Sequence, residues 1–215
     1  MSFLLKSLSR AVHEEQQHQH DEVQEHHNTD VGLCTSLTVW RKSLVISCKG
    51  FTVFDSYGNL VYRVDNYIGR PDQVTLMDAS GNSVLTMRRR RVNLGLIDSW
   101  IVYEGEAGKH CRTIKTPSCW VKKKVNILHS NPSVIAYVYR EASDKRYAYA
   151  IQGSYSHRSC KVLDQSKRLV AEIKRKETIT GGISFGIEVF QLIVHPGFDP
   201  GFAMGLVLLL DQMFS

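Results

Sequence analysis

Three clusters of basic side chains are the part of this sequence whose residue types and spacing point to chemistry. They are Arg88, Arg89, Arg90 and Arg91; Lys122, Lys123 and Lys124; and Lys174, Arg175 and Lys176. Cations spaced this closely bind anions, either the head groups of membrane lipids or the phosphates of nucleic acids. Separate solvated loops also carry such clusters, and the sequence alone leaves that interpretation open.

The charge of the chain is unevenly distributed, which favours an anionic partner. The net charge is +6, but residues 1–31 hold two basic and six acidic side chains, so the remaining 25 basic and 15 acidic residues carry +10. Near an anionic membrane leaflet each basic residue contributes about 1 kcal/mol, so four to seven give at most about 4 to 7 kcal/mol. We therefore expect weak, reversible docking that needs a second signal.

The alternation of side chains along a strand limits where these clusters can lie. Successive side chains of a strand point to opposite faces. Four consecutive arginines inside a strand would direct two unpaired charges into the interior, at several kcal/mol each. We expect Arg88–Arg91 and Lys122–Lys124 at strand ends or in loops, with every side chain in solvent. If the three clusters share one rim, they form a basic collar.

Histidines and cysteines provide weaker candidates for catalysis or metal binding. The acidic tail contains His13, His18, His20, His26 and His27, whose spacing does not define one coordination geometry. His110 adjoins Cys111, but neighbouring strand residues face opposite ways, and His157 and Cys160 flank a predicted hairpin. No glycine-rich phosphate loop follows a strand into a helix. We expect no metal, no cofactor and no enzyme activity.

The cysteines and the apolar segments bear on the compartment. The five cysteines are irregularly spaced without a C-x-x-C pair, and Lys6 interrupts the apolar N-terminus, so neither a disulfide framework nor a signal peptide is expected. The apolar run 202–210 is shorter than the roughly 20 residues of a membrane span. We expect an intracellular protein, cytoplasmic with a peripheral membrane or nuclear pool.

A short unit that occurs three times predicts the elements that position the clusters. It consists of an apolar run, an Asp, a turn and a second apolar run, at residues 51–64, 74–87 and, more weakly, 160–173. Asp55 and Asp78 can bond the turn backbone, and Gly58 and Gly81 can adopt positive φ, which is typical of β-hairpins. Further strands are expected at 37–40, 43–47, 100–103, 125–128, 134–139, 147–151 and 188–194.

The last segment departs from this pattern and predicts the architecture. Residues 202–210 are apolar on every side, with Asp199 as N-cap and Pro200 in the first turn. Such a helix must be surrounded on all sides, and about a dozen strands close into a barrel that needs a filler. We expect a mainly β fold: a closed antiparallel barrel of about 12 strands over 32–215, wrapped around a central helix at 200–214. Residues 1–31 should form a disordered tail with a short amphipathic helix at 3–12.

Several segments together resemble the plant LURP-one-related family, from about Leu37 to the C-terminus. The segments are 37–40, 50–65, 76–81, 100–105 and 196–199. The resemblance implies the fold of the tubby and phospholipid-scramblase group, a twelve-stranded barrel around a C-terminal helix. It also implies a role in plant defence, with binding of anionic phospholipids or a link to transcription suggested by relatives of that fold.

Three functions remain open at this point. The first is a non-enzymatic binding module that docks weakly on anionic phospholipid in plant defence, through the three basic clusters. The second is a protein-interaction or transcription-linked adaptor that enters the nucleus through the same clusters. The third is an enzyme with a small pocket at the barrel mouth. Sequence-specific DNA binding is not expected, because no helix-turn-helix, zinc-finger or basic-zipper pattern is present.

Overall fold

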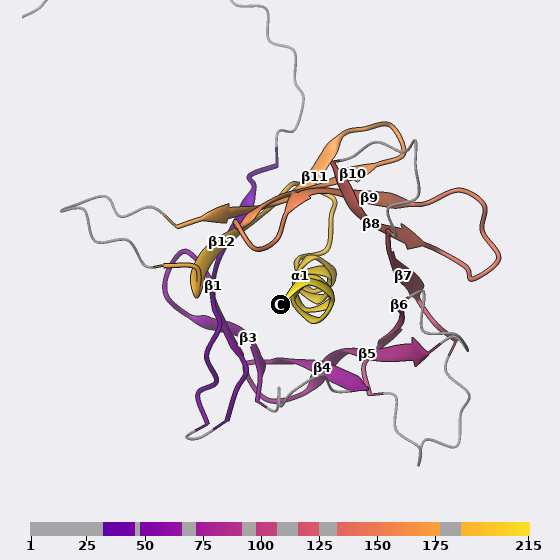
Figure 1. Cartoon of the computed structure of the whole chain (residues 1–215). Coiled ribbons are helices and arrows are strands. Elements are labelled where there is room, and N and C mark those ends of the chain that lie inside the picture. The colour runs from indigo at the N-terminus through magenta and orange to yellow at the C-terminus, as the bar shows by residue number, and fades with distance from the viewer. Residues whose placement is uncertain are drawn as a thin grey trace, which may run out of the picture. The chain divides into compact units, whose positions relative to one another are not determined.

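A closed ring of twelve strands surrounds one helix in the computed structural model (Figure 1). The structure describes residues 32–45, 48–65, 72–91, 98–106, 116–124, 133–176 and 186–215. The first half of the ring contains β1 (Thr35–Trp40), β2 (Phe51–Phe54), β3 (Leu60–Val64), β4 (Gln73–Asp78), β5 (Ser83–Arg91) and β6 (Asp98–Glu104). The second half contains β7 (Cys119–Lys123), β8 (Val134–Tyr139), β9 (Tyr149–Ser154), β10 (Ser159–Asp164), β11 (Leu169–Arg175) and β12 (Val189–Val194), followed by α1 (Pro200–Phe214).

Each strand pairs antiparallel with its neighbours in chain order, and β1 closes the ring against β12. In this closing ladder Leu37 lies opposite Leu192 and Val39 opposite Phe190. All four side chains are buried, and they alternate with more exposed ones along both strands. This period of two directs one face of every strand towards the centre of the barrel.

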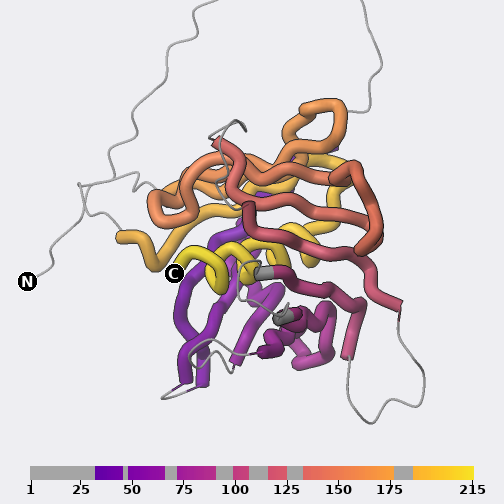
Figure 2. The backbone as a smooth tube through the Cα atoms, turned by 45° about the vertical axis from the view of Figure 1, so that its right-hand side comes forward, coloured from indigo at the N-terminus to yellow at the C-terminus, as the bar shows by residue number. Residues whose placement is uncertain are grey.

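The helix α1 runs through that centre, as the turned view in Figure 2 shows. Asp199 caps it, because its Oδ1 accepts a hydrogen bond of 2.6 Å from the backbone N–H of Phe202, and Pro200 occupies the first turn. The residues from Ala203 to Met213 are all buried. The expected closed barrel with a C-terminal helix is confirmed.

Two glycines let the helix approach one side of the barrel. A Cβ atom on Gly205 would come within 2.9 Å of Leu85 Cδ1, and one on Gly201 within 3.3 Å of Val84 Cγ1. Both neighbours belong to β5, so the face of the helix without side chains is turned to this strand. Larger residues there would have to displace the packed wall.

The predicted hairpins are present, and their aspartates organise the turns. Asp55 Oδ1 accepts hydrogen bonds from the backbone N–H groups of Tyr57 and Asn59, at 2.9 and 2.8 Å. Asp78 and Asp164 bond the residue four positions later in the same way. Gly58 and Gly81 have φ of +86° and +91°, the region that favours glycine.

Some expected elements differ from the structure. Residues 43–45, predicted to begin a strand, form bends instead, and β7 was not anticipated because it is short and ends in lysines. The predicted strand at 125–128, the tail of residues 1–31 and its helix at 3–12 lie outside the described residues. No helix within the described part of the chain is long and apolar enough to cross a membrane.

Replacing Leu206 with Asp should unfold the domain. The side chain is 1% exposed at the centre of the barrel, and a charge there has no partner. The cost of several kcal/mol is comparable to the total stability of a typical domain, about 5–15 kcal/mol. Leu206→Met, the matched control, should cost less than about 1.5 kcal/mol. A thermal melt of Leu206→Asp that matches the control would refute the central position of the helix.

The turn aspartates predict a loss of stability in acid. Hydrogen bonds from the residue four positions later are the main cause that lowers the pKa of Asp55, Asp78 and Asp164 below its ordinary value. An acid with a lowered folded pKa stabilises the fold above its unfolded pKa, and this contribution disappears as the pH falls through the folded value. We expect the free energy of unfolding in urea to decrease as the pH falls below about 4.

The control for this pH effect is the triple variant Asp55→Asn, Asp78→Asn and Asp164→Asn. An amide keeps one oxygen acceptor for the turn but does not titrate. Its unfolding free energy should therefore change less between pH 5 and pH 2 than that of the unmodified chain. An equal pH dependence in both proteins would show that other carboxylates are responsible.

Candidate functional site

Strand direction brings the three basic clusters to one end of the barrel. All neighbouring strands are antiparallel, so the odd-numbered strands all end at the same rim. The clusters Arg88–Arg91, Lys122–Lys124 and Lys174–Lys176 lie at the ends of β5, β7 and β11. We call this end the basic rim and the opposite end, which carries the Asp turns of 55–59, 78–82 and 164–168, the hairpin rim.

The arginine run ends its strand, as expected, but it remains paired within the sheet. Arg88 lies opposite Ile101 and Arg89 opposite Trp100 of β6. Arg88 points outward, where its Nε donates to Gln73 Oε1 at 2.8 Å and its guanidinium lies over Tyr103. Arg90 is exposed, whereas Arg88 and Arg89 are half-buried. The prediction that every side chain lies fully in solvent is therefore wrong for Arg88 and Arg89, and the side chain of Arg91 lies outside the described residues.

The lysine cluster divides between the two faces of the barrel wall. Lys122 points outward, with its ammonium 4.6 Å from the ring centroid of Tyr139. Lys123 points inward and donates a hydrogen bond of 2.7 Å to the carbonyl of Met213, in the last turn of α1. A cation there satisfies a terminal carbonyl and complements the negative end of the helix dipole. Lys123 is therefore a structural residue rather than a solvent-facing one, contrary to the expectation.

The third cluster is exposed but partly engaged. Lys174 forms an ion pair of 2.9 Å with Glu172, and Arg175 Nε donates to the carbonyl of His157 at 3.1 Å. Lys176 Nζ donates to Thr38 Oγ1 of β1 at 2.9 Å, across β12, which lies between β11 and β1. These contacts orient the cations without removing them from solvent, since Lys174 and Arg175 remain exposed.

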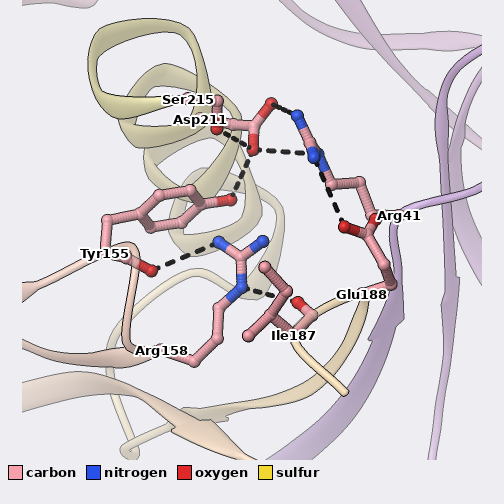
Figure 3. Close-up of polar contacts among 7 residues, drawn as sticks. All are labelled: Arg41, Tyr155, Arg158, Ile187, Glu188, Asp211 and Ser215. Atoms are coloured by element: carbon pink, nitrogen blue, oxygen red, sulfur yellow. Dashed lines mark hydrogen bonds and ion pairs between the residues drawn. The ribbon is translucent and has the colours of Figure 1, made fainter. Parts of the chain in front are cut away.

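Beneath the rim, the helix ends in one buried carboxylate (Figure 3). Asp211 is 1% exposed and forms a two-pronged pair with Arg41, with Nε 3.1 Å from Oδ1 and Nη2 3.3 Å from Oδ2. The Oδ1 atom also accepts hydrogen bonds from the hydroxyls of Tyr155, at 3.0 Å, and Ser215, at 2.8 Å. These donors compensate the cost of burying the charge.

Arg41 couples this interior network to the surface. Its Nη1 lies 3.5 Å from Glu188 Oε1 at the start of β12. Burial opposes the charge of Arg41, but the carboxylates of Asp211 and Glu188 outweigh it and raise the pKa of the guanidinium above its ordinary value. The side chain is thus a permanent cation, fixed in position from two sides.

A second arginine, Arg158, packs against the ring of Tyr155. It is 3% exposed and its guanidinium lies 4.2 Å from the ring centroid of Tyr155 and 4.5 Å from that of Phe190. Its Nε donates to the carbonyl of Ile187 at 2.8 Å (Figure 3). Two aromatic faces and a carbonyl stabilise this buried cation. Nothing in the local sequence pattern had indicated it.

The described residues provide close pairs of nucleophile and base, but in unfavourable settings. Cys34 Sγ lies 3.6 Å from His195 Nδ1, and Ser154 Oγ lies 2.8 Å from His157 Nδ1. Cys34 and His157 are exposed, so water surrounds one member of each pair. Sequence spacing had missed the pair of Cys34 and His195, which lie far apart in the chain. His110 and Cys111 lie outside the described residues.

The two buried thiols, Cys119 and Cys160, do not favour catalysis. Cys160 is buried, unlike its neighbour His157, and burial raises the pKa of the thiols of Cys119 and Cys160 to about 12. A thiol in this state is a poor nucleophile. Within the described ranges there is no group of three His, Cys, Asp or Glu side chains that could hold a metal ion.

Removing Arg41 and removing Asp211 should lower the unfolding free energy by unequal amounts. Arg41→Leu leaves the buried carboxylate of Asp211 without its cation and should cost about 3–5 kcal/mol of unfolding free energy. Asp211→Leu should cost less, because Arg41 is 33% exposed and water can hydrate its charge. The double variant should be more stable than Arg41→Leu alone. Urea unfolding of the three variants measures this, and a double variant less stable than both single ones would contradict it.

Known proteins match this chain across the whole barrel. The LURP-one-related family model matches residues 35–211. LURP-one-related 17 of Arabidopsis thaliana is 52% identical over 189 residues, covering 86% of this chain and 85% of that protein. LURP-one-related 8 of the same plant is 48% identical, covering 85% of this chain and 91% of the relative.

A solved structure supports the fold independently of the family model. An X-ray structure of an Arabidopsis thaliana protein superposes with a TM-score of 0.59 at 25% identity, covering 84% of this chain and 91% of that one. The barrel, its central helix and the match over residues 35–211 lead to one assignment. This chain belongs to the LURP-one-related family.

Proposed function

We propose that this chain is a non-enzymatic binding module whose basic rim docks reversibly on anionic phospholipid surfaces. The observation that carries this proposal is the position of three basic clusters at one end of the barrel. Cations gathered at one end can face a flat anionic surface together, whereas cations spread around the barrel cannot. The setting in plant defence signalling is proposed from the family resemblance, and a cytoplasmic protein with a peripheral membrane pool is proposed from the cysteine pattern and the basic clusters.

Apolar side chains at the same rim supply the second signal that weak docking needs. Six large apolar side chains are exposed among the described residues. Four of them lie at the basic rim, where β1 ends or β12 begins: Trp40, Leu44, Val45 and Ile187. Apolar and aromatic residues beside cations are the composition of segments that enter the interface of a bilayer. We propose that Leu44 and Val45 insert while the cations contact the head groups.

The expected affinity follows from the cations that face solvent. The outward set comprises Arg88, Arg90, Lys122, Lys174 and Arg175, whereas Lys123 is engaged with α1. At about 1 kcal/mol each, these five give about 5 kcal/mol, which corresponds to a dissociation constant of a few tenths of a millimolar. Attachment of this strength is transient and falls with ionic strength.

The structure of the arginine run argues against the adaptor that enters the nucleus through it. Short basic import signals are accessible peptide segments, but here the backbone of the run is occupied on two sides. Arg88 pairs with Gln73 of β4 and with Ile101 of β6, and the N–H of Arg89 donates to the carbonyl of Asp72 at 2.8 Å. Presenting this run as a peptide would require β5 to leave the barrel. We therefore favour the lipid surface.

Sedimentation with vesicles tests the proposal. Vesicles of phosphatidylcholine with increasing phosphatidylglycerol should bind the protein increasingly, and added salt should reverse binding. Arg88→Ala with Arg90→Ala should weaken binding by about tenfold or more. Leu44→Ser with Val45→Ser should weaken it at unchanged charge.

The matched control removes two cations from the hairpin rim, Lys145→Ala with Arg146→Ala. Both residues are exposed in the connection between β8 and β9. This variant has the same net charge as Arg88→Ala with Arg90→Ala, so it should bind vesicles like the unmodified chain. Equal weakening in both variants would show that net charge alone is responsible. Binding that ignores the phosphatidylglycerol content would end the proposal.

A further inference from the structure

A small pocket opens at the basic rim, beside the exposed apolar side chains. Its volume is about 280 Å³, and it lies between the end of β1, the start of β2 and the start of β12. The residues that line it are Arg41, Lys42, Cys48, Lys49, Gly50 and Glu188. At about 30 Å³ per water molecule, this volume corresponds to about nine waters, which is enough for a phosphate group and a small alcohol.

The lining carries three cations and one carboxylate, Glu188. With the buried Asp211 behind Arg41 counted as well, the site has an excess of one positive charge. Arg41 is held in place by its contacts with Asp211 and Glu188. A guanidinium has five N–H donors, and these three contacts leave two for a ligand. Because the interior of the barrel fixes this side chain, binding an anion loses little side-chain entropy.

The two lysines complete the positive charge of the pocket from exposed positions. Lys42 and Lys49 are exposed, and Lys42 lies 5.2 Å from the ring centroid of Trp40. Gly50 lies at the other side of the pocket, where a Cβ atom would come within 1.8 Å of the carbonyl oxygen of Val64. The backbone of β2 can therefore approach β3 closely only with glycine at this position.

We propose that this pocket binds a phosphate monoester, through Arg41, Lys42 and Lys49. A monoester carries a charge near −2 at neutral pH and three acceptor oxygens, one for each of the three cationic side chains. A phosphodiester has only two free acceptor oxygens and a single charge, so it leaves one of the three cations without an oxygen and is attracted less strongly. The monoester can belong to a lipid head group or to a soluble molecule. The lipid case rests on the proposed function, whereas the soluble case does not.

A second, larger concavity lies at the same rim, and its three basic side chains are all engaged, whereas the smaller pocket adds two exposed lysines to the engaged Arg41. The larger concavity measures about 750 Å³ and includes Arg158, Glu172, Lys174 and Arg175. Lys174 is paired with Glu172, Arg175 donates to a backbone carbonyl, and Arg158 is buried between two rings. An anion there would have to displace existing contacts, so the smaller pocket is the better site.

The test compares a monoester with a diester at equal surface charge. Vesicles contain either phosphatidic acid or phosphatidylglycerol, and glycerol phosphate is titrated as the soluble monoester by calorimetry. The pocket variant is Lys42→Ala with Lys49→Ala, both exposed positions, and its thermal melt should match that of the unmodified chain. The matched control at the same rim is Arg88→Ala with Arg90→Ala. We avoid Arg41 because its loss also destabilises the helix.

The unmodified chain should prefer phosphatidic acid over phosphatidylglycerol. The pocket variant should lose this preference and bind glycerol phosphate at least about tenfold more weakly. The control should bind both vesicles more weakly while keeping the preference. If glycerol phosphate binding depends on Lys42 and Lys49 but vesicles with phosphatidic acid are not preferred over those with phosphatidylglycerol, the pocket binds a soluble monoester.

Other results would overturn the proposal. The pocket does not bind a monoester if vesicles with phosphatidic acid are not preferred over those with phosphatidylglycerol and glycerol phosphate does not bind. The same follows if the preference survives Lys42→Ala with Lys49→Ala. Vesicle binding that still increases with phosphatidylglycerol would then leave the docking of the basic rim intact. Conversely, loss of all vesicle binding with retained, lysine-dependent binding of glycerol phosphate would refute the docking and support the pocket.

Discussion

The apolar helix α1 is stable in water only because twelve strands enclose it, and this enclosure determines the chemistry of the rim where it ends. Its last turn brings a buried carboxylate, Asp211, and carbonyls without partners in the helix to the edge of the barrel. The wall must supply cations there, because the last turn contains no basic residue of its own. Arg41 and Lys123 supply them. A positive rim is thus in part a requirement of the core.

The basic rim carries more cations than the end of the helix needs. Lys123 and Arg41 face the helix, whereas Arg88 and Arg90 of β5 and Lys122 of β7 lie on the outer face of the barrel. This difference separates residues that hold the fold from residues that are available for recognition. Arg41 belongs to both groups, since it joins the buried carboxylate to the surface. Any ligand that binds Arg41 is therefore also linked to the central helix.

The sequence was sufficient for the elements whose signals are local. The Asp turns, the capped apolar helix and the need to enclose it predicted the barrel, and β7 was missed because lysines interrupt its apolar pattern. The partner of Asp211 could not be predicted, because Arg41 is 170 residues away and is one of 27 basic residues. The pocket could not be predicted from the sequence either, because its lining comes from three separated segments.

The position of α1 also constrains how the domain acquires its structure. The element that fills the centre is the last of the barrel to be synthesised, and the closing ladder joins β1 to β12 across most of the chain. Contacts between such distant segments form slowly, because a long loop must close first. The early strands therefore emerge from the ribosome without their core. Their apolar faces need protection, by chaperones or by one another, until the final helix arrives.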